Sequence, residues 1–118
     1  MLQVDGLTLA RAAVDAAADK KADDIILLDL RETSPVADFF VVCSGSNERQ
    51  IAAIADNIQD KLREQHGSKP YRVEGGGSSG WLLLDYGDVI AHLFTEEMRR
   101  YYNLEELWNK ANVVLKVF

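Results

Sequence analysis

The stretch WLLLDYGDVIAHLF, Trp81–Phe94, decides the fold. Two apolar runs flank the dipeptide Tyr86-Gly87, and such runs around a two-residue turn predict a β-hairpin. A turn at this dipeptide sets the register of the hairpin. The expected pairs are Asp85 with Asp88, Leu84 with Val89, Leu82 with Ala91, and Trp81 with His92.

Alternation along the two strands separates their side chains onto two faces. The first face is wholly apolar, which predicts that it packs on the core; it carries Leu82, Leu84, Val89, Ala91 and Leu93. The second face mixes rings, carboxylates and an imidazole, namely Trp81, Leu83, Asp85, Asp88, Ile90, His92 and Phe94. Like charges placed directly opposite each other destabilise a hairpin, so this second face is a candidate functional site.

Outward from the hairpin, apolar runs predict strands at Ile25–Leu30, Asp38–Cys43 and Tyr71–Glu74. The first two are joined by a short loop and are therefore expected to be antiparallel. Apolar stripes at helical spacing predict helices over residues 5–21 and 48–65, with Asn47 as the cap of the second. Because a helix joins strands 38–43 and 71–74, these two strands are expected to be parallel, which makes the sheet mixed.

The C-terminal third is harder to interpret. Thr95 is expected to cap a helix, and Leu104–Lys110 is expected to continue it for a turn or two. The apolar, β-branched tail Asn112–Phe118 fits either an edge strand or an arm. The glycine-rich segment Gly75–Gly80 is expected to be a flexible loop.

The composition indicates one α+β domain over residues 1–118, with a mixed five-stranded sheet packed with helices. The single cysteine, Cys43, lies in an apolar run and is expected to be a buried small side chain. No disulfide can form within the chain, and no signal peptide or membrane span is evident, which indicates a cytoplasmic protein. The net charge of −6 disfavours nucleic acid and suits a basic protein partner.

Three kinds of chemical site compete with ordinary structural roles for the same residues. Gly45-Ser46 before a helix could cradle a phosphate, but no lysine of the Walker type follows, and a turn with an N-cap is favoured. Asp85, Asp88 and His92 could share a metal ion, yet about 13 Å of strand separates Asp88 from His92. The serines lack the strained elbow of a nucleophile. No catalytic, cofactor-binding or metal-binding residue is therefore expected.

A protein-binding surface fits the residues better. Trp, Tyr and Arg are enriched at interface hot spots, and the last third of the chain gathers Trp81, Tyr86, Arg99, Tyr101, Tyr102 and Trp108. Tyr101 and Trp108 are expected to pack the C-terminal helix on the sheet. Trp81 fits a role in core packing and a role in partner binding about equally well.

The chain resembles the ribosomal silencing factor family, also called Iojap-like. The resemblance covers about Leu7 to Ala111 and depends on the order and spacing of several phrases. These are DFFVV at Asp38–Val42, SGSNERQ at Ser44–Gln50, Glu74-Gly75, WLLLDYGD at Trp81–Asp88, HLF at His92–Phe94 and RRYYNLEELW at Arg99–Trp108.

The resemblance implies a nucleotidyltransferase-like fold without the catalytic carboxylates, and a factor that is not an enzyme. It further implies binding to the large ribosomal subunit through ribosomal protein L-fourteen, a block of subunit joining, and repression of translation when nutrients are scarce. Family members are expected to form homodimers off the ribosome, with no cofactor. The competing hypotheses are a nucleotidyltransferase-like enzyme and a homodimerising scaffold.

On this basis the second face of the hairpin is expected to be the docking surface. The expected partner-binding residues are Trp81, Leu83, Asp85, Asp88 and His92, with Arg99 and Tyr102 alongside.

Overall fold

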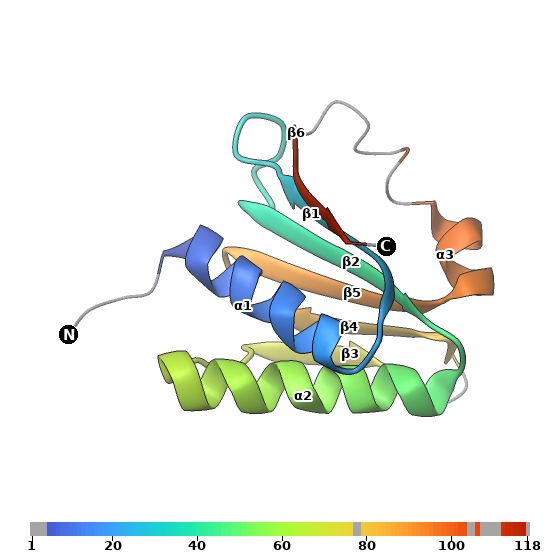
Figure 1. Cartoon of the computed structure of the whole chain (residues 1–118). Helices are drawn as coiled ribbons and strands as arrows, with labels where there is room; N and C mark the ends of the chain where they lie inside the picture. Colours follow the sequence, from blue (N-terminus) through green and yellow to red (C-terminus); the bar gives the residue numbers. More distant parts are fainter. Residues whose placement is uncertain (1–4, 77–78, 104–105, 107–111, 118) are drawn as a thin grey trace.

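The computed structural model describes residues 5–76, 79–103, 106 and 112–117 (Figure 1). The helices are α1 (Gly6–Asp19), α2 (Glu48–His66) and α3 (Glu96–Tyr102). The strands are β1 (Asp23–Asp29), β2 (Phe39–Gly45), β3 (Arg72–Gly75), β4 (Trp81–Asp85), β5 (Val89–Thr95) and β6 (Asn112–Val117). The predicted continuation of the last helix over Leu104–Lys110 lies largely outside the described residues.

The strands form one sheet in the order β3-β4-β5-β2-β1-β6. β2 and β5 are parallel, and every other neighbouring pair is antiparallel, so the predictions of a mixed sheet and of antiparallel β1 and β2 are confirmed. The prediction of five strands is wrong, because the tail adds β6 as an edge strand beside β1. Its β-branched residues allow this pairing, but only contact with β1 selects it over a free arm.

The crossover from β2 through α2 returns to β3 at the far edge of the sheet. β3 runs in the same direction as β2, as expected, but β5 and β4 lie between them. The parallel neighbour of β2 is instead β5, which comes later in the chain. Short β3, exposed along its whole length, ends the sheet on this side.

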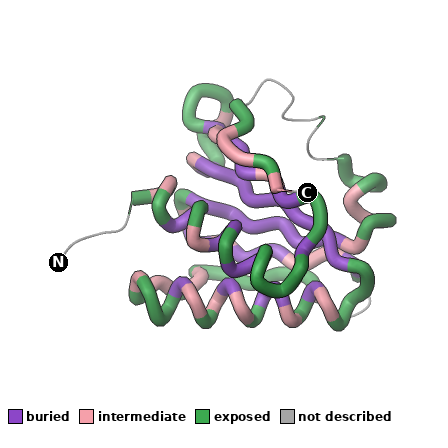
Figure 2. Tube along the Cα trace, viewed as in Figure 1, coloured by how far each residue is buried: buried purple, intermediate pink, exposed green. Residues whose placement is uncertain are grey.

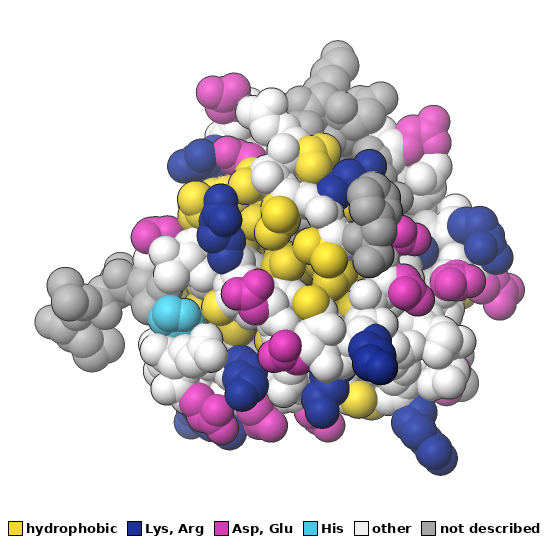
Figure 3. Space-filling model, in the orientation of Figure 1, with side chains coloured by type: hydrophobic (Ala, Val, Ile, Leu, Met, Phe, Trp, Pro, Cys, Tyr) yellow, Lys and Arg dark blue, Asp and Glu magenta, His cyan; other side chains and the backbone are white. Residues whose placement is uncertain are grey.

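α1 and α2 cover one face of the sheet, with the buried part of the chain concentrated in the central strands (Figures 1 and 2). The core on this face joins the alanine-rich side of α1 and the isoleucine stripe of α2 to side chains that include Leu84, Val89, Ala91 and Leu93. In Figure 3 hydrophobic side chains also gather above α1. The partly buried Leu115 and Val117 of β6 pack against the same core. A second cluster, with Phe40, Leu83, Ile90 and Phe94, lies on the opposite face.

Local signals set the helix ends. The Asn47 side chain accepts a hydrogen bond from the Gln50 N–H at 2.8 Å, which is the predicted N-cap of α2. Gly67 ends that helix with φ 64°, a left-handed conformation that glycine adopts without strain. Asp5 caps α1 and Thr95 caps α3 in the same way as Asn47. None of the described helices is both long enough and apolar enough to cross a membrane.

The hairpin exists, but its predicted register is wrong by two residues. Asp85 lies opposite Ile90, and Trp81 lies opposite Phe94. The Tyr86 N–H donates to the Val89 carbonyl at 2.8 Å, so the two-residue turn is Gly87-Asp88. Gly87 has φ 88°, and a turn that needs positive φ at its first central position takes glycine there, not tyrosine. A shift of two leaves each side chain on its predicted face.

Candidate functional site

Four rings lie together where β4, β5 and α3 meet, on the face of the sheet opposite α1 and α2. We call Trp81, His92, Phe94 and Tyr102 the aromatic cluster. The Trp81 ring lies 6.3 Å from His92, 6.2 Å from Phe94 and 5.5 Å from Tyr102, centroid to centroid. The His92 and Phe94 rings are stacked, with an angle of 5° between their planes. Alternation on the strands places the first three rings side by side, and α3 adds the fourth.

The four side chains of the aromatic cluster differ in their exposure to solvent. His92 and Phe94 are buried, Trp81 is half-buried, and 41% of Tyr102 is exposed. Leu83 pairs directly with His92 and is also buried, so it supports the cluster from within the sheet. Trp81 and Tyr102 therefore form the accessible part of the predicted docking surface.

His92 is held as a neutral ring. Burial lowers its pKa to about 4, because the charged imidazolium would lose its hydration. Phe40 meets the ring edge-on at 4.6 Å. Among the described residues, none forms a hydrogen bond with either ring nitrogen of His92 or with Nε1 of Trp81. Unpaired buried polar groups cost stability, so the cluster is not the packing that would stabilise the fold most.

α3 extends the aromatic surface into solvent. None of its residues is buried, and Tyr101 is 76% exposed with its ring edge-on to Tyr102 at 5.2 Å. The prediction that Tyr101 packs α3 on the sheet is wrong. Met98 and Tyr102, four residues apart in this short helix, face the apolar cluster under it. Consecutive helical residues project about 100° apart, so Tyr101 points further toward solvent than Tyr102. Trp108, the other residue given a packing role, lies outside the described residues.

Arg99 holds α3 to the sheet and does not belong to the aromatic cluster. Its Nη1 donates to the Asp24 carbonyl at 2.6 Å and to the Ser44 hydroxyl at 2.9 Å. Arg99 contacts the Asp24 carbonyl at a β-bulge in β1. At this bulge two residues, Asp24 and Ile25, lie opposite the single residue Cys43 of β2. Asp24 has φ 47°, a left-handed conformation that is strained for most residues but tolerated by aspartate. Sequence spacing could not reveal this bulge.

The two hairpin aspartates are separated in the structure. Asp85 stays on the face of Trp81, at the opposite end of β4, and its carboxylate accepts the Gly87 N–H at 2.8 Å and an Arg72 N–H at 3.4 Å. Asp88 lies exposed in the turn, next to the start of α1, where a Cβ on Gly6 would be 3.6 Å from the Asp88 Cβ. The predicted face-to-face carboxylates therefore do not occur.

The alternative sites receive ordinary structural roles. The Ser46 N–H and hydroxyl both donate to the Gln50 side chain, so Gly45-Ser46 forms the turn before α2. Cys43 is fully buried, and burial raises the pKa of its thiol to about 12, which makes it unreactive. The described residues contain no cluster of three histidine, cysteine or acidic side chains that could hold a metal ion.

The chain is similar to known proteins over nearly its whole length. Residues 4–117 match the family model described as "Ribosomal silencing factor during starvation". A ribosomal silencing factor of Bacillus subtilis is 42% identical over 111 residues, which is 94% of this chain and 91% of that protein. One from Halalkalibacterium halodurans is 42% identical over 106 residues, 90% of each chain. The chloroplastic Iojap protein of Zea mays is 34% identical over 92% of this chain, which corresponds to 46% of the maize protein.

Solved structures agree with these relatives. A crystal structure of a Chromobacterium violaceum protein superposes with a TM-score of 0.85 at 32% identity, over 95% of this chain and 94% of that one. A second, from Bacillus halodurans, gives a TM-score of 0.77 at 38% identity, over 96% and 99% of the two chains. Both sequence and fold therefore match over nearly the whole chain.

Proposed function

Because the chain belongs to the ribosomal silencing factor family, we propose that it binds the large ribosomal subunit through ribosomal protein L-fourteen and blocks joining of the small subunit. The observation that carries the proposal is the similarity to ribosomal silencing factors over nearly the whole chain. In this proposal the protein represses translation in the cytoplasm when nutrients are scarce. It does so by occupying a surface that the small subunit must touch, which requires no catalysis and no cofactor.

The docking surface in this proposal is centred on Trp81 and Tyr102. A half-buried indole beside an exposed tyrosine provides area and a fixed position at little conformational cost, and such pairs are typical of interface hot spots. The buried side chains of Leu83 and His92 support the Trp81 indole on its sheet side. Tyr101 extends the surface along α3, and Arg99 fixes the position of that helix.

Charge supports a basic protein partner in preference to RNA. The chain has a net charge of −6, and phosphate contacts need lysine and arginine in excess. Exposed Asp88 and the partly buried Asp85, which is paired with Arg72, place carboxylates on the same hairpin, some distance from Trp81. These carboxylates would speed association with a basic surface while contributing less to its lifetime.

Self-association uses the same surface in our proposal. Exposed aromatic side chains such as Tyr101 and Tyr102 are costly to leave in water, and a second copy could cover them. Dimer formation and ribosome binding would then compete. Sedimentation velocity of the full chain, with and without the Tyr102→Ala change, tests this part: a dimer that the change dissociates supports it, and an unchanged dimer contradicts it.

The test of the main proposal is co-sedimentation of the purified protein with large ribosomal subunits, followed by a subunit-joining assay on sucrose gradients. We expect saturable binding to large subunits, none to small subunits, and a loss of joined ribosomes as protein is added. Purified L-fourteen should capture the protein by itself. Joining that is unaffected at saturating protein would overturn the proposed block, and capture that requires ribosomal RNA would overturn the choice of partner.

A further inference from the structure

Among the described residues, three of the four buried side-chain polar atoms that lack a hydrogen bond lie in the aromatic cluster. They are Nε1 of Trp81 and both ring nitrogens of His92, and the fourth is the hydroxyl of Tyr86. Such groups are rare in native proteins, because each has given up its hydrogen bonds to water without gaining another. Their concentration at the proposed docking surface indicates that they are paired when the partner is bound.

The group that Trp81 lacks is a hydrogen-bond acceptor. The indole N–H can only donate, and lysine and arginine side chains can only donate as well. A basic side chain laid over the indole in a cation–π contact would therefore leave Nε1 unpaired. A carboxylate could accept the hydrogen bond, but burying its charge in an apolar cluster with Leu83 and Phe94 would be costly. The acceptor that fits is an uncharged carbonyl oxygen.

His92 adds a second requirement. Its ring is neutral, because burial lowers its pKa, so one ring nitrogen donates and the other accepts. The ring is stacked with Trp81 at 6.3 Å between centroids and 6° between planes, so one peptide segment can reach the edges of both rings. A residue in extended conformation presents its N–H and its carbonyl oxygen on the same side of the chain. Such a residue matches the donor of Trp81 and the acceptor of His92 together.

From these observations we propose that the aromatic cluster recognises an extended main-chain segment of the protein partner, whose carbonyl oxygen accepts the Trp81 Nε1–H. The inference rests on the proposed function, and it names the chemical group that the docking surface selects. Apolar contact with the indole then provides area, while this hydrogen bond fixes the register of the partner segment. A partner without a free main-chain carbonyl at this point leaves Nε1 unpaired and is disfavoured.

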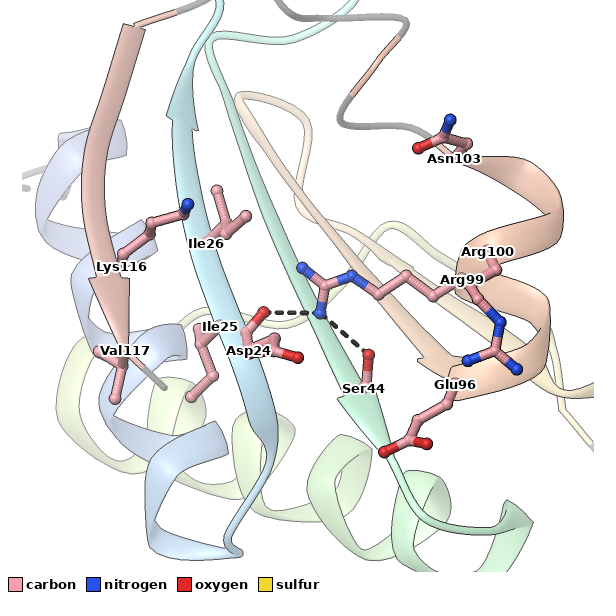
Figure 4. Close-up of a pocket in the computed structure, with 10 residues that line it drawn as sticks. All are labelled: Asp24, Ile25, Ile26, Ser44, Glu96, Arg99, Arg100, Asn103, Lys116 and Val117. Carbon is pink, nitrogen blue, oxygen red and sulfur yellow. Dashed lines mark hydrogen bonds between the residues drawn. The ribbon is translucent and has the colours of Figure 1, made fainter.

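The Trp81 N–H is enclosed in the free protein, so docking requires a small rearrangement. α3 itself is held, because the Arg99 side chain reaches from it to the Asp24 carbonyl and the Ser44 hydroxyl (Figure 4). The Tyr102 side chain is freer, since it lies at the end of α3 and is 41% exposed. Exposed side chains change rotamer within nanoseconds. Rotation of Tyr102 therefore opens the edge of the indole at little cost, while the helix stays docked.

The test removes the N–H of Trp81 and keeps the shape of the ring. Benzothienylalanine has sulfur in place of the indole N–H, and site-specific incorporation introduces it at this position alone in the full chain. We expect Trp81→benzothienylalanine to bind purified large ribosomal subunits about tenfold more weakly, the effect of one lost hydrogen bond. Its melting temperature should rise by a few degrees, because the free protein no longer buries an unpaired donor.

Tyr86→Phe is the matched control. It removes the fourth unpaired polar atom, the hydroxyl of a side chain that is buried in the core under α1 and α2. Its melting temperature should rise in the same way, whereas its affinity for large subunits should be unchanged. An equal loss of affinity in Tyr86→Phe would show that the loss arises from the fold and not from the docking surface, and would overturn the inference.

A spectroscopic readout follows the indole N–H itself. In wild-type protein with isotope-labelled tryptophan, the Trp81 indole proton should move downfield on addition of purified L-fourteen and should exchange more slowly with water. The benzothienylalanine protein assigns this resonance, because it lacks it. A resonance that does not move when L-fourteen binds would overturn the inference.

The outcomes separate this inference from the proposed function. Full affinity in the benzothienylalanine protein would overturn the inference alone, since a partner that contacts only the face of the ring by cation–π or apolar contact would still bind. Wild-type protein that fails to bind large subunits would overturn the proposed function, and the inference with it. An asparagine or glutamine of L-fourteen whose change to alanine is not additive with the benzothienylalanine change would assign the acceptor to a side-chain amide, and would overturn the main-chain assignment.

Discussion

Asp85 lies opposite Ile90 across the β4–β5 hairpin, and its carboxylate turns back to accept the Gly87 N–H at 2.8 Å. The same carboxylate meets Arg72 of the edge strand β3 at 3.4 Å. Asp85 therefore joins three consecutive strands at the turn. Asp88, its expected partner, is exposed and uses its backbone carbonyl to accept the N–H groups of Asp38 and Phe39.

This arrangement predicts different effects for two similar changes. Asp85→Ala removes a hydrogen-bond acceptor from the turn and should lower the free energy of unfolding by about 1–2 kcal/mol. Asp88→Ala leaves its backbone contacts intact and should change stability by less than about 0.5 kcal/mol. Urea denaturation of both variants measures the difference. Equal effects would contradict the role assigned to the Asp85 carboxylate.

Two glycines with positive φ predict a second contrast. Gly67 has φ 64° and open space around it, so Gly67→Ala should cost only the strain of a left-handed alanine, about 1 kcal/mol. Gly75 has φ 82°, and a Cβ there would lie 2.1 Å from the Trp81 carbonyl oxygen, so the backbone of β4 must move. Gly75→Ala should therefore cost more than about 3 kcal/mol. Thermal unfolding of the two variants checks this order, and a reversed order would contradict it.

His92 predicts a loss of stability in acid. Its pKa is lowered to about 4 in the folded protein, and an unfolded histidine titrates near 6.5. Between these values the unfolded chain binds the extra proton, so stability falls as the pH is lowered from about 6.5 to 4, by about 3 kcal/mol in all. Above pH 6.5 the effect is absent.

The measurement is chemical denaturation at several pH values, with His92→Leu and His66→Gln as a pair. The first variant should lose this part of the pH dependence, because the titrating ring is gone. His66→Gln removes the other histidine, at the end of α2, and should keep this pH dependence of stability. A pH dependence that persists in His92→Leu would assign it to the carboxylates.

The contacts of Arg99 predict how stably α3 docks on the sheet. The helix has no buried residue, and the Arg99 bonds to Asp24 and Ser44 tie it to β1 and β2. Arg99→Ala should destabilise the docked helix by about 1–2 kcal/mol, which is roughly tenfold faster hydrogen exchange of its amides. Arg100→Ala, next to it and without these bonds, should leave exchange unchanged. Identical exchange in both variants would show that side chains other than Arg99 hold α3.

The aromatic cluster predicts the energetics of docking. If Trp81 anchors the partner, Trp81→Ala should weaken binding to large ribosomal subunits by about 2 kcal/mol or more, and Tyr102→Ala by about 1–2 kcal/mol. Tyr71→Ala is the matched control, because this tyrosine is 83% exposed and lies beside the turn at Gly87, away from the cluster. Circular dichroism confirms folding in each case. Full affinity in a folded Trp81→Ala variant would remove Trp81 from the interface.

Local patterns were sufficient for much of this fold. The spacing of apolar residues located α1, α2 and the strands up to β5, while the Thr95 cap located α3. Asn47 and Gly67 set the ends of α2. The two faces of the hairpin followed from alternation, which a register shift of two residues cannot disturb. The same alternation brought Trp81, His92 and Phe94 onto one face, so the position of the candidate site was determined by the sequence.

Contacts between distant segments decided the rest. The tail became β6 because β1 had an open edge, and β3 lies at the other edge because β5 took the place beside β2. The turn at Gly87 is an exception, because its position follows from a local preference of glycine for positive φ. The burial of His92, the exposure of Tyr101 and the Arg99–Asp24 contact each depend on which element packs over which. Such pairings are non-local, and periodicity within one segment carries no information about them.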